Sequence, residues 1–245
     1  MTHTIYDQHA EFYISFIQNV STNRAFLLTI QTILAELGDL DGLEICDLAC
    51  GEGVLSRILA AQGAQMSGFD LSSRLIDHAR KNSDPTIAFA VNDAQTLVGV
   101  PNSTFDVVVC HMAIMDIPNI DALFATTKRI LKPNGRFVLT VLHPCFETPF
   151  KAPKGIVETD ENGAFVACRV MNYKEEGLWN SGGVGVRGHM GAYHRKLSTY
   201  MNALVSSGFT LYKLAEPMLT NDNYESMHDQ WEMKIPRRLT IFCTA

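Results

Sequence analysis

The chain has 245 residues, 47% of them hydrophobic and 19% charged, with a formal net charge of −6 at pH 7. This composition argues against a disordered chain, a collagen and a coiled coil, and it is typical of an enzyme-like globular domain. The acidic balance provides no overall field that would attract phosphate backbones, so we expect a small-molecule partner and no nucleic acid.

The six cysteines contain no C-x-x-C pair, and four of them lie in or beside apolar runs. We therefore expect reduced, buried thiols and no metal site, as is usual in a reducing compartment. The amino-terminal residues show neither the basic region nor the apolar core of a signal peptide, and no run approaches the roughly 18 apolar residues of a membrane span. The sequence predicts a cytoplasmic protein with no membrane partner, and it does not indicate the oligomeric state.

Two helices are expected before any strand, because apolar residues recur at helical spacing over 7–20 and over 26–37, where Gly38 ends the pattern. Strands and helices then alternate. Apolar runs predict strands at 43–48, 66–69, 87–91, 105–110 and 136–142. Helical periodicity predicts helices that begin at 54 and that cover 72–81 and 120–131. The segment Lys132-Pro133-Asn134-Gly135 is expected to end the last helix and to turn the chain into the fifth strand.

This alternation predicts right-handed crossovers and a parallel sheet with helices on both faces. The expected fold class is therefore α/β, with a doubly wound, Rossmann-like core. In sheets of this kind ligands bind at the carboxyl ends of the strands, so the functional residues should lie in the loops that follow the strands.

The pattern changes beyond residue 142. Residues 151–192 hold 8 of the 17 glycines and show no sustained periodicity, which predicts a cap over the core or a mobile insert. An amphipathic helix is expected over 197–205, followed by strands at 209–214 and 239–243. We expect a single domain over 1–245 with four parts, which are amino-terminal helices (1–38), a cofactor-binding core (39–142), a substrate cap insertion (143–192) and a carboxyl-terminal helix with strands (193–245).

The strongest local signal is the glycine turn after the first expected strand, Asp47-Leu48-Ala49-Cys50-Gly51-Glu52-Gly53. Its glycines allow a ligand to approach the backbone closely, and the helix that follows offers unpaired amide groups. Asp70 ends the second strand, where an acid can accept hydrogen bonds from both hydroxyls of a ribose. Asp93 follows the third strand and can accept a hydrogen bond from an exocyclic amine. A turn and two acids in this order predict a nucleoside site.

The spacing of the glycines distinguishes between two kinds of cofactor. A nicotinamide fingerprint requires G-x-G-x-x-G, but Ser56 stands at the third glycine, which disfavours pyrophosphate binding and an oxidoreductase. The stretch instead resembles motif I of the class I S-adenosylmethionine-dependent methyltransferases, in which an acid, here Asp47, precedes a D-x-G-x-G-x-G turn. Ala49 stands where the first glycine of that turn is usual.

The resemblance covers residues 40–142. Its further marks are Phe69-Asp70-Leu71-Ser72, Asn92-Asp93-Ala94, Phe105-Asp106-Val107-Val108 and Leu131-Lys132-Pro133-Asn134-Gly135-Arg136. It implies a sheet of seven strands with the last one antiparallel, and S-adenosyl-L-methionine as the cofactor.

The resemblance also implies a set of cofactor-binding residues, made up of Asp47, Ala49, Gly51, Gly53, Asp70, Leu71, Asp93, Ala94 and His111. Gly51 and Gly53 would line the methionine part, Asp70 would hold the ribose, and His111 would pack beside the sulfonium. Asp93 would bind the adenine amine, and the amide of Ala94 would bind the edge of the ring. Each assignment has a structural alternative, which is a plain turn for the glycines, a helix cap or loop acid for the aspartates, and core packing for His111.

Methyl transfer requires a general base only when the nucleophile arrives protonated. His143, at the end of the fifth strand, can take a proton at neutral pH and is the first candidate for a base or an acceptor-orienting residue. His189 and Tyr193, followed by His194 and Arg195, form a second cluster that would face an acidic group or the substrate. The alternatives are a structural histidine at 143 and solvated side chains in the second cluster.

Methyltransferases of nucleic-acid or protein amines often carry Asn or Asp followed by Pro-Pro and an aromatic residue after the fourth strand, whereas residues 110–115 here read Cys-His-Met-Ala-Ile-Met. The resemblance thus implies methyl transfer to an O-, N- or C-nucleophile of a small molecule. An open alternative is a protein of the same fold that binds the cofactor structurally or catalyses a non-methylating reaction.

Overall fold

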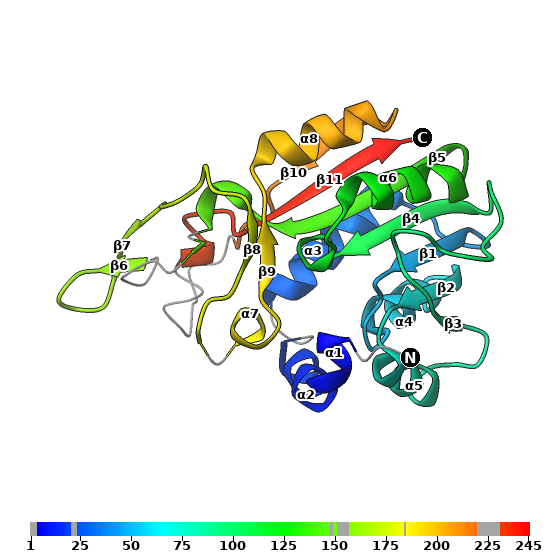
Figure 1. Ribbon diagram of the computed structural model, residues 1–245, viewed down its shortest axis with the longest axis horizontal. Helices are drawn as coiled ribbons and strands as arrows, with labels where there is room; N and C mark the ends of the chain where they lie inside the picture. The colour runs from blue at the N-terminus through cyan, green and yellow to red at the C-terminus, as the bar shows by residue number, and fades with distance from the viewer. Residues whose placement is uncertain (1–3, 21–23, 148, 151–156, 184, 220–230) are drawn as a thin grey trace.

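A seven-stranded sheet organises the residues that the computed structural model describes, which are 4–20, 24–147, 149–150, 157–183, 185–219 and 231–245 (Figure 1). In spatial order the strands are β10 (Thr210–Ala215), β11 (Arg238–Thr244), β5 (Leu131–Leu142), β4 (Phe105–His111), β1 (Glu44–Leu48), β2 (Gln65–Asp70) and β3 (Ala88–Val91). The strands from β1 to β5 run parallel, and β11 pairs antiparallel with both β5 and β10. This confirms the expected α/β, Rossmann-like sheet with an antiparallel last strand.

Helices cover both faces of the sheet, and each face has its own hydrophobic core. The helices α3 (Arg24–Leu37), α4 (Val54–Ala60) and α5 (Ser73–Lys81) pack on one face, and α6 (Ile120–Ile130) and α8 (Leu197–Ser206) pack on the other. Within β4, Val107 and Val109 belong to the first core and Val108 belongs to the second. Because both faces are buried, the strands appear in the sequence as uninterrupted apolar runs.

The helix expected over 7–20 is two helices, α1 (Ile5–Gln8) and α2 (Ala10–Val20). A capping box begins α1, since the Thr4 hydroxyl accepts from the Asp7 amide at 2.9 Å and the Asp7 carboxylate accepts from the Thr4 amide at 3.0 Å. His9, with φ −113° and ψ 23°, ends α1. The short helix α1 packs against α5, next to the carboxyl ends of the parallel strands (Figure 1).

The fifth strand begins earlier than expected. Leu131 already pairs with Phe105, and the pairing then shifts so that Arg136 lies opposite Val107. The segment 132–135 is therefore an irregularity inside β5 and not a turn before it. Asn134, at φ +62°, provides the left-handed residue that this bulge requires.

The region expected to form the cap contains two antiparallel hairpins. The first pairs β6 (Val157–Thr159) with β7 (Phe165–Cys168), and the second pairs β8 (Gly177–Trp179) with β9 (Ala192–His194). A short helix, α7 (Val186–His189), lies between β8 and β9. The second hairpin crosses the boundary predicted at residue 192, because β9 continues to His194 and leads directly into α8.

All six cysteines are free thiols, four of them buried, with Cys145 and Cys168 partly exposed. Among the helices of the described ranges, none is long and apolar enough to cross a membrane.

Candidate active site

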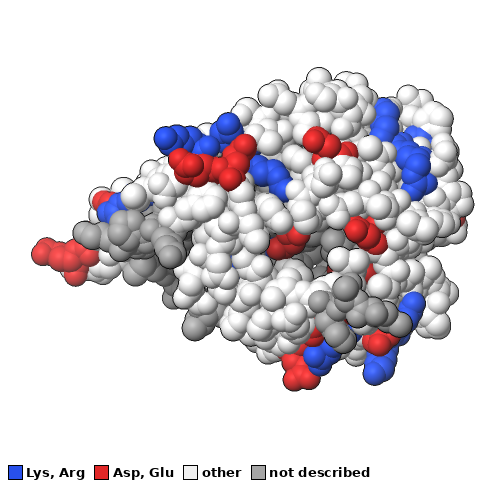
Figure 2. Space-filling view, viewed as in Figure 1, with Lys and Arg blue, Asp and Glu red and all other residues white. Residues whose placement is uncertain are grey.

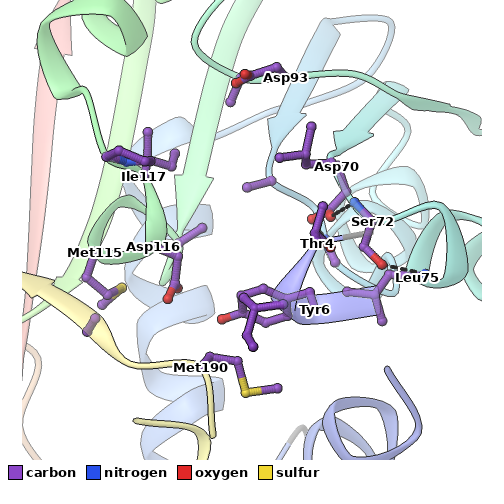
Figure 3. A pocket seen from close by; sticks show the side chains of 18 of the residues that line it. Thr4, Tyr6, Asp70, Ser72, Leu75, Asp93, Met115, Asp116, Ile117 and Met190 are labelled. Carbon is purple, nitrogen blue, oxygen red and sulfur yellow. Dashed lines mark hydrogen bonds between the residues drawn. The ribbon is translucent and has the colours of Figure 1, made fainter. Parts of the chain in front are cut away.

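A cavity of about 450 Å³ lies at the carboxyl ends of the parallel strands, where the sequence predicted the functional residues (Figure 3). The turn after β1 and the loops after β2, β3 and β4 form one side of it. Residues of α1, α2 and the β8–β9 hairpin form the rest. The cavity is thus built from the core, the amino-terminal helices and the β8–β9 hairpin together.

The turn after β1 follows a left-handed path at two positions that line the cavity. Ala49 has φ +56° and Gly51 has φ +58°. A Cβ atom at Gly51 would lie 3.3 Å from the ring and hydroxyl of Tyr13 on α2. Ala49 adopts a left-handed conformation at the position where glycine is usual. Gly51, which has no Cβ atom, leaves room for the Tyr13 ring above the turn.

Asp70 lies at the end of β2 and lines the cavity. One carboxylate oxygen accepts a hydrogen bond from the Gly51 amide at 2.9 Å, and the other accepts from the Ser72 amide at 2.8 Å. Burial raises the pKa of Asp70 to about 6, although these two hydrogen bonds favour the ionised form. A carboxylate has about four acceptor positions, so Asp70 can still accept hydrogen bonds from a ligand.

Asp93, Ala94 and Leu71, three of the residues predicted to bind the cofactor, also line the cavity. Asp93 accepts from the amide and from the side chain of Gln95, at 2.8 and 3.1 Å. Leu71 is 52% exposed and adds an apolar side chain to the lining that suits a flat ring.

His111, the last residue of β4, lines the cavity as well. Its Nε2 lies 2.9 Å from the hydroxyl of Thr29 on α3, and its ring meets that of Phe26 edge to face at 5.3 Å. Burial lowers the pKa of His111 to about 4, so the imidazole is neutral at physiological pH.

Asp47 and Gly53 are not among the described residues that line the cavity, so their predicted direct contact with the cofactor lacks support from the geometry. Asp47 is buried behind the turn and accepts from the Ser56 hydroxyl at 2.7 Å, and burial raises its pKa to about 7. Gly53 begins α4 at φ +86°, and a Cβ atom there would lie 2.8 Å from the Phe89 ring. Both residues shape the turn from behind.

The three catalytic candidates lie in different places. Tyr193 lines the cavity. His189 instead packs against α2, with its ring centroid 4.4 Å from that of Phe12. His143 is buried, and it also stands outside the described residues that line the cavity. Its Nε2 lies 2.8 Å from Glu216 Oε1, and its Nδ1 accepts from the Cys145 amide at 3.2 Å.

The neighbours of Tyr193 do not fit the alternative of solvated side chains in this cluster. His194 and Arg195 are both buried. Arg195 donates at 2.7 Å to the backbone carbonyls of Ile117 and Pro118, which follow the 3-10 helix η1 (Ile114–Asp116). These contacts attach the start of α8 to the loop after β4 and give Arg195 a structural role.

Sequence reasoning missed four residues at the remaining side of the cavity. Tyr6 and Tyr13 line it from α1 and α2, and their rings meet edge to face at 5.1 Å. Asp116 lines it from η1, and Arg187 of α7 forms an ion pair with Asp116 at 2.6 Å. The available signal was an acid two residues before Pro118, shortly after the fourth strand, but only the fold shows that an arginine from the cap meets it.

The lining residues fit an S-adenosyl group on the evidence of their own chemistry. Carboxylates suit ribose hydroxyls and an exocyclic amine, and the apolar surface of Leu71 suits a purine ring. Among the described residues that line the cavity, none is a lysine or an arginine that would repel a sulfonium.

Comparison with known proteins agrees with this chemistry. Residues 46–139 match the family described as "Methyltransferase domain". The fold is similar to that of an S-adenosylmethionine-dependent methyltransferase from Mesorhizobium loti, with a TM-score of 0.73 and 24% identity over 91% of this chain and 99% of that one. It is also similar to a Listeria monocytogenes protein assigned to the same class, with a TM-score of 0.70 and 26% identity over 88% and 97% of the two chains.

In sequence, the chain is 32% identical over 140 residues to the ubiquinone biosynthesis O-methyltransferase of Xanthomonas oryzae. That match covers 56% of this chain and 57% of the relative, so the chain spans little more than half the length of this curated relative. The segment that the methyltransferase family matches is the segment that forms the core side of the cavity, so residues 46–139 are a methyltransferase domain, in a fold similar to that of S-adenosylmethionine-dependent methyltransferases.

Proposed function

We propose that the protein transfers a methyl group from S-adenosylmethionine to a small-molecule acceptor. The observation that carries this proposal is the size and covering of the cavity. It has a volume of about 450 Å³ and is covered by α1, α2 and the β8–β9 hairpin. A cavity of this size suits a cofactor with a small acceptor beside it.

The proposed cofactor contacts follow the geometry of the lining. Asp70 accepts hydrogen bonds from the ribose hydroxyls, Asp93 accepts from the adenine amine, and the amide of Ala94 meets the edge of the ring. Ala49 and Gly51 border the methionine part, and Leu71 and His111 pack against the ligand. Asp47 and Gly53 support cofactor binding indirectly, because they keep the backbone of the turn in its left-handed conformation.

When bound, the cofactor supplies an activated methyl group on a sulfonium. The residues of this chain hold the acceptor in line with that group and exclude water, which is the main contribution that a protein makes to such a displacement. Tyr6 and Tyr13 serve this purpose by covering the cavity from above the turn. We propose residues 143–192, together with Tyr193, as the cap that selects the acceptor.

Two further observations support a small acceptor over a nucleic acid. On the face shown in Figure 2, the Lys and Arg side chains occur in small separate groups and form no continuous basic surface. The sequence similarity to an O-methyltransferase of ubiquinone biosynthesis also supports a small organic acceptor. The six free thiols support the proposal that the protein works in the cytoplasm.

Thermal unfolding with S-adenosylmethionine, S-adenosylhomocysteine and NAD, each added separately, tests the proposal. A ligand at 100 times its dissociation constant adds about 2.7 kcal/mol of stability, and each kcal/mol raises the Tm by about 2–4 °C. We expect the two sulfur nucleosides to raise the Tm and NAD to leave it unchanged. An acceptor screen for S-adenosylhomocysteine formation then follows. Cofactor binding with no such product from any small acceptor would favour the non-methylating alternative.

A further inference from the structure

Asp116 places a carboxylate in the part of the cavity that the cofactor residues do not occupy. Figure 3 shows Asp116 on the side away from Asp93, with its oxygens pointing toward the hydroxyl of Tyr6. The thioether side chains of Met115 and Met190 line the same cavity. A carboxylate in such apolar surroundings is costly unless it is paired and hydrogen-bonded, so its partners define what it can do there.

Among the residues that the structure describes, two side chains face Asp116 and hold it in place. Arg187 Nη1 donates to Asp116 Oδ1 at 2.6 Å and also to the Gly191 carbonyl at 3.0 Å. The Tyr6 hydroxyl faces Asp116 (Figure 3), and burial together with this acid raises the pKa of Tyr6 well above its ordinary value, so the phenol stays protonated and can donate to Asp116. Burial raises the pKa of Asp116 above its ordinary value, and the charge of Arg187 opposes this effect and favours the carboxylate form.

The carboxylate lies between the guanidinium and the cavity. Asp116 lines the cavity, whereas Arg187 is not among the described residues that do so. The two partners use two of the about four acceptor positions of a carboxylate. Asp116 can therefore accept further hydrogen bonds from a molecule in the cavity.

The charge of the lining restricts what that molecule can be. The described lining carries three acids, Asp70, Asp93 and Asp116, with no lysine or arginine, and His111 is neutral at physiological pH. A carboxylate or phosphate next to Asp116 would be repelled in a region of low dielectric constant. A group with an N–H or O–H bond would instead be attracted, most strongly if it were cationic.

We propose that Asp116, held by Arg187 and Tyr6, binds the acceptor through an N–H or O–H group, and that the acceptor is a neutral or cationic molecule and not an anion. This inference rests on the proposed function, because it assumes that the cofactor occupies the side of the cavity near Asp70 and Asp93. An anionic acceptor would have to displace Asp116 from Arg187, and breaking a buried ion pair leaves an uncompensated charge.

Three probes that share a benzene ring and differ in charge test this inference, namely benzylamine, benzyl alcohol and benzoate. Their binding is measured by ligand-detected NMR to the protein saturated with S-adenosylhomocysteine. We expect benzylamine and benzyl alcohol to bind the wild type, and benzoate to bind at least about tenfold more weakly than benzylamine. Asp116→Asn should weaken the binding of benzylamine by about tenfold and reduce the difference in affinity between benzylamine and benzoate.

Two variants separate this effect from a loss of folding. Tyr6→Phe keeps the ring and removes the hydroxyl that faces Asp116, so it should weaken the binding of benzylamine by about two- to tenfold. Asp121→Asn makes the same change as Asp116→Asn at an exposed position on α6 and should leave all three affinities unchanged. Both Asn variants should bind S-adenosylhomocysteine like the wild type.

Tighter binding of benzoate than of benzylamine, no binding of either the amine or the alcohol, or equal effects of the two Asn variants would each overturn the inference while the proposed function stands. Failure of the wild type to bind S-adenosylhomocysteine would instead overturn the proposed function, and this inference with it.

Discussion

A single residue of the cavity can both stabilise the local backbone and face the ligand, and Asp70 does both. Its carboxylate accepts from the amides of Gly51 and Ser72, which aligns the turn after β1 with the start of α5. The same carboxylate faces the cavity, where a ligand with two hydroxyls can share it. Local order and ligand binding thus depend on one side chain.

Asp70→Ala should weaken S-adenosylhomocysteine binding by more than about tenfold, because it removes charge-assisted hydrogen bonds. Isothermal titration calorimetry measures the affinity, with Asp77→Ala, an exposed acid on α5, as the control. Since burial raises the pKa of Asp70 to about 6, the wild-type affinity should also fall as the pH drops below about 6 and the carboxylate becomes protonated. An affinity that is independent of pH from 5 to 8 would remove the ribose assignment.

His143→Ala should reduce stability and not cofactor affinity, because His143 lies outside the described lining and bonds Glu216 and the Cys145 amide. We expect a loss of about 1–3 kcal/mol in urea unfolding and an unchanged affinity for S-adenosylhomocysteine. In a double-mutant cycle with Glu216→Gln, the two losses should be less than additive. Normal stability together with lost turnover would restore His143 as a candidate base.

At the scale of elements, the position of α1 depends on the hydrogen bonds of one residue, Asp7. Asp7 Oδ1 accepts from the Ser72 hydroxyl at 2.7 Å and from the Arg74 amide at 3.2 Å, which fastens α1 to the start of α5. This attachment holds Tyr6 over the cavity. The helix has four residues, so its own hydrogen bonds cannot stabilise it.

Asp7→Ala should lower the free energy of unfolding by about 1–3 kcal/mol, because it leaves capping and hydroxyl groups without their acceptor. Burial alone would raise the pKa of Asp7, but hydrogen bonds from Ser72, Thr4 and Arg74 lower it to about 2. The stabilisation is therefore present above pH 4 and is lost as the pH falls from about 4 to about 2. Urea unfolding at pH 7 and pH 2.5 checks this, since the difference between Asp7→Ala and wild type should shrink at the lower pH.

Glu11→Ala provides the matched control for Asp7→Ala. Glu11 pairs with Arg74 at 2.9 Å from the neighbouring helix α2, but its side chain is 88% exposed. Exposed pairs contribute little, so this variant should change stability by less than about 1 kcal/mol. Equal losses from the two variants would contradict the role assigned to Asp7.

Elements were predicted well where apolar periodicity is strong, and poorly where a turn interrupts it. The strands and helices from β1 to α6 lie close to their expected positions because each buries a continuous apolar run or stripe. The start of β5 was wrong because Lys132-Pro133-Asn134-Gly135 has the composition of a turn, and only the pairing of Leu131 with Phe105 shows it to be a bulge. The hairpins of the cap were missed because their strands of three or four residues are too short to show alternation.

For the whole molecule, the buried acid Asp47 links stability to pH. Burial raises its pKa from the ordinary 3.8 to about 7. Between about pH 4 and pH 7 the folded state therefore holds a proton that the unfolded state has released, so this group makes stability fall as the pH rises through that window.

The side chain of the Asp47→Asn variant cannot ionise, so this variant should not lose stability in this way as the pH rises. Its stability relative to the wild type should increase by about 1–3 kcal/mol between pH 5 and pH 8, as measured by urea unfolding without ligand. The amide oxygen of Asn can still accept from Ser56, which keeps the turn in place. A constant difference between the two proteins across this range would show that Asp47 is already ionised at pH 5.

The sequence by itself determined the α/β class, the order of the parallel strands along the chain, and the core side of the cavity with Gly51, Asp70 and Asp93. These features are local, since each depends on a run of apolar residues or on a turn next to the strand that it follows. The tertiary structure alone decided the other side. Asp116 and Arg187 are 71 positions apart, and Tyr6 comes from α1, near the amino terminus of the chain. Their meeting depends on how the amino-terminal helices and the cap pack over the sheet, and side chains brought together across such distances leave no periodic pattern in the sequence.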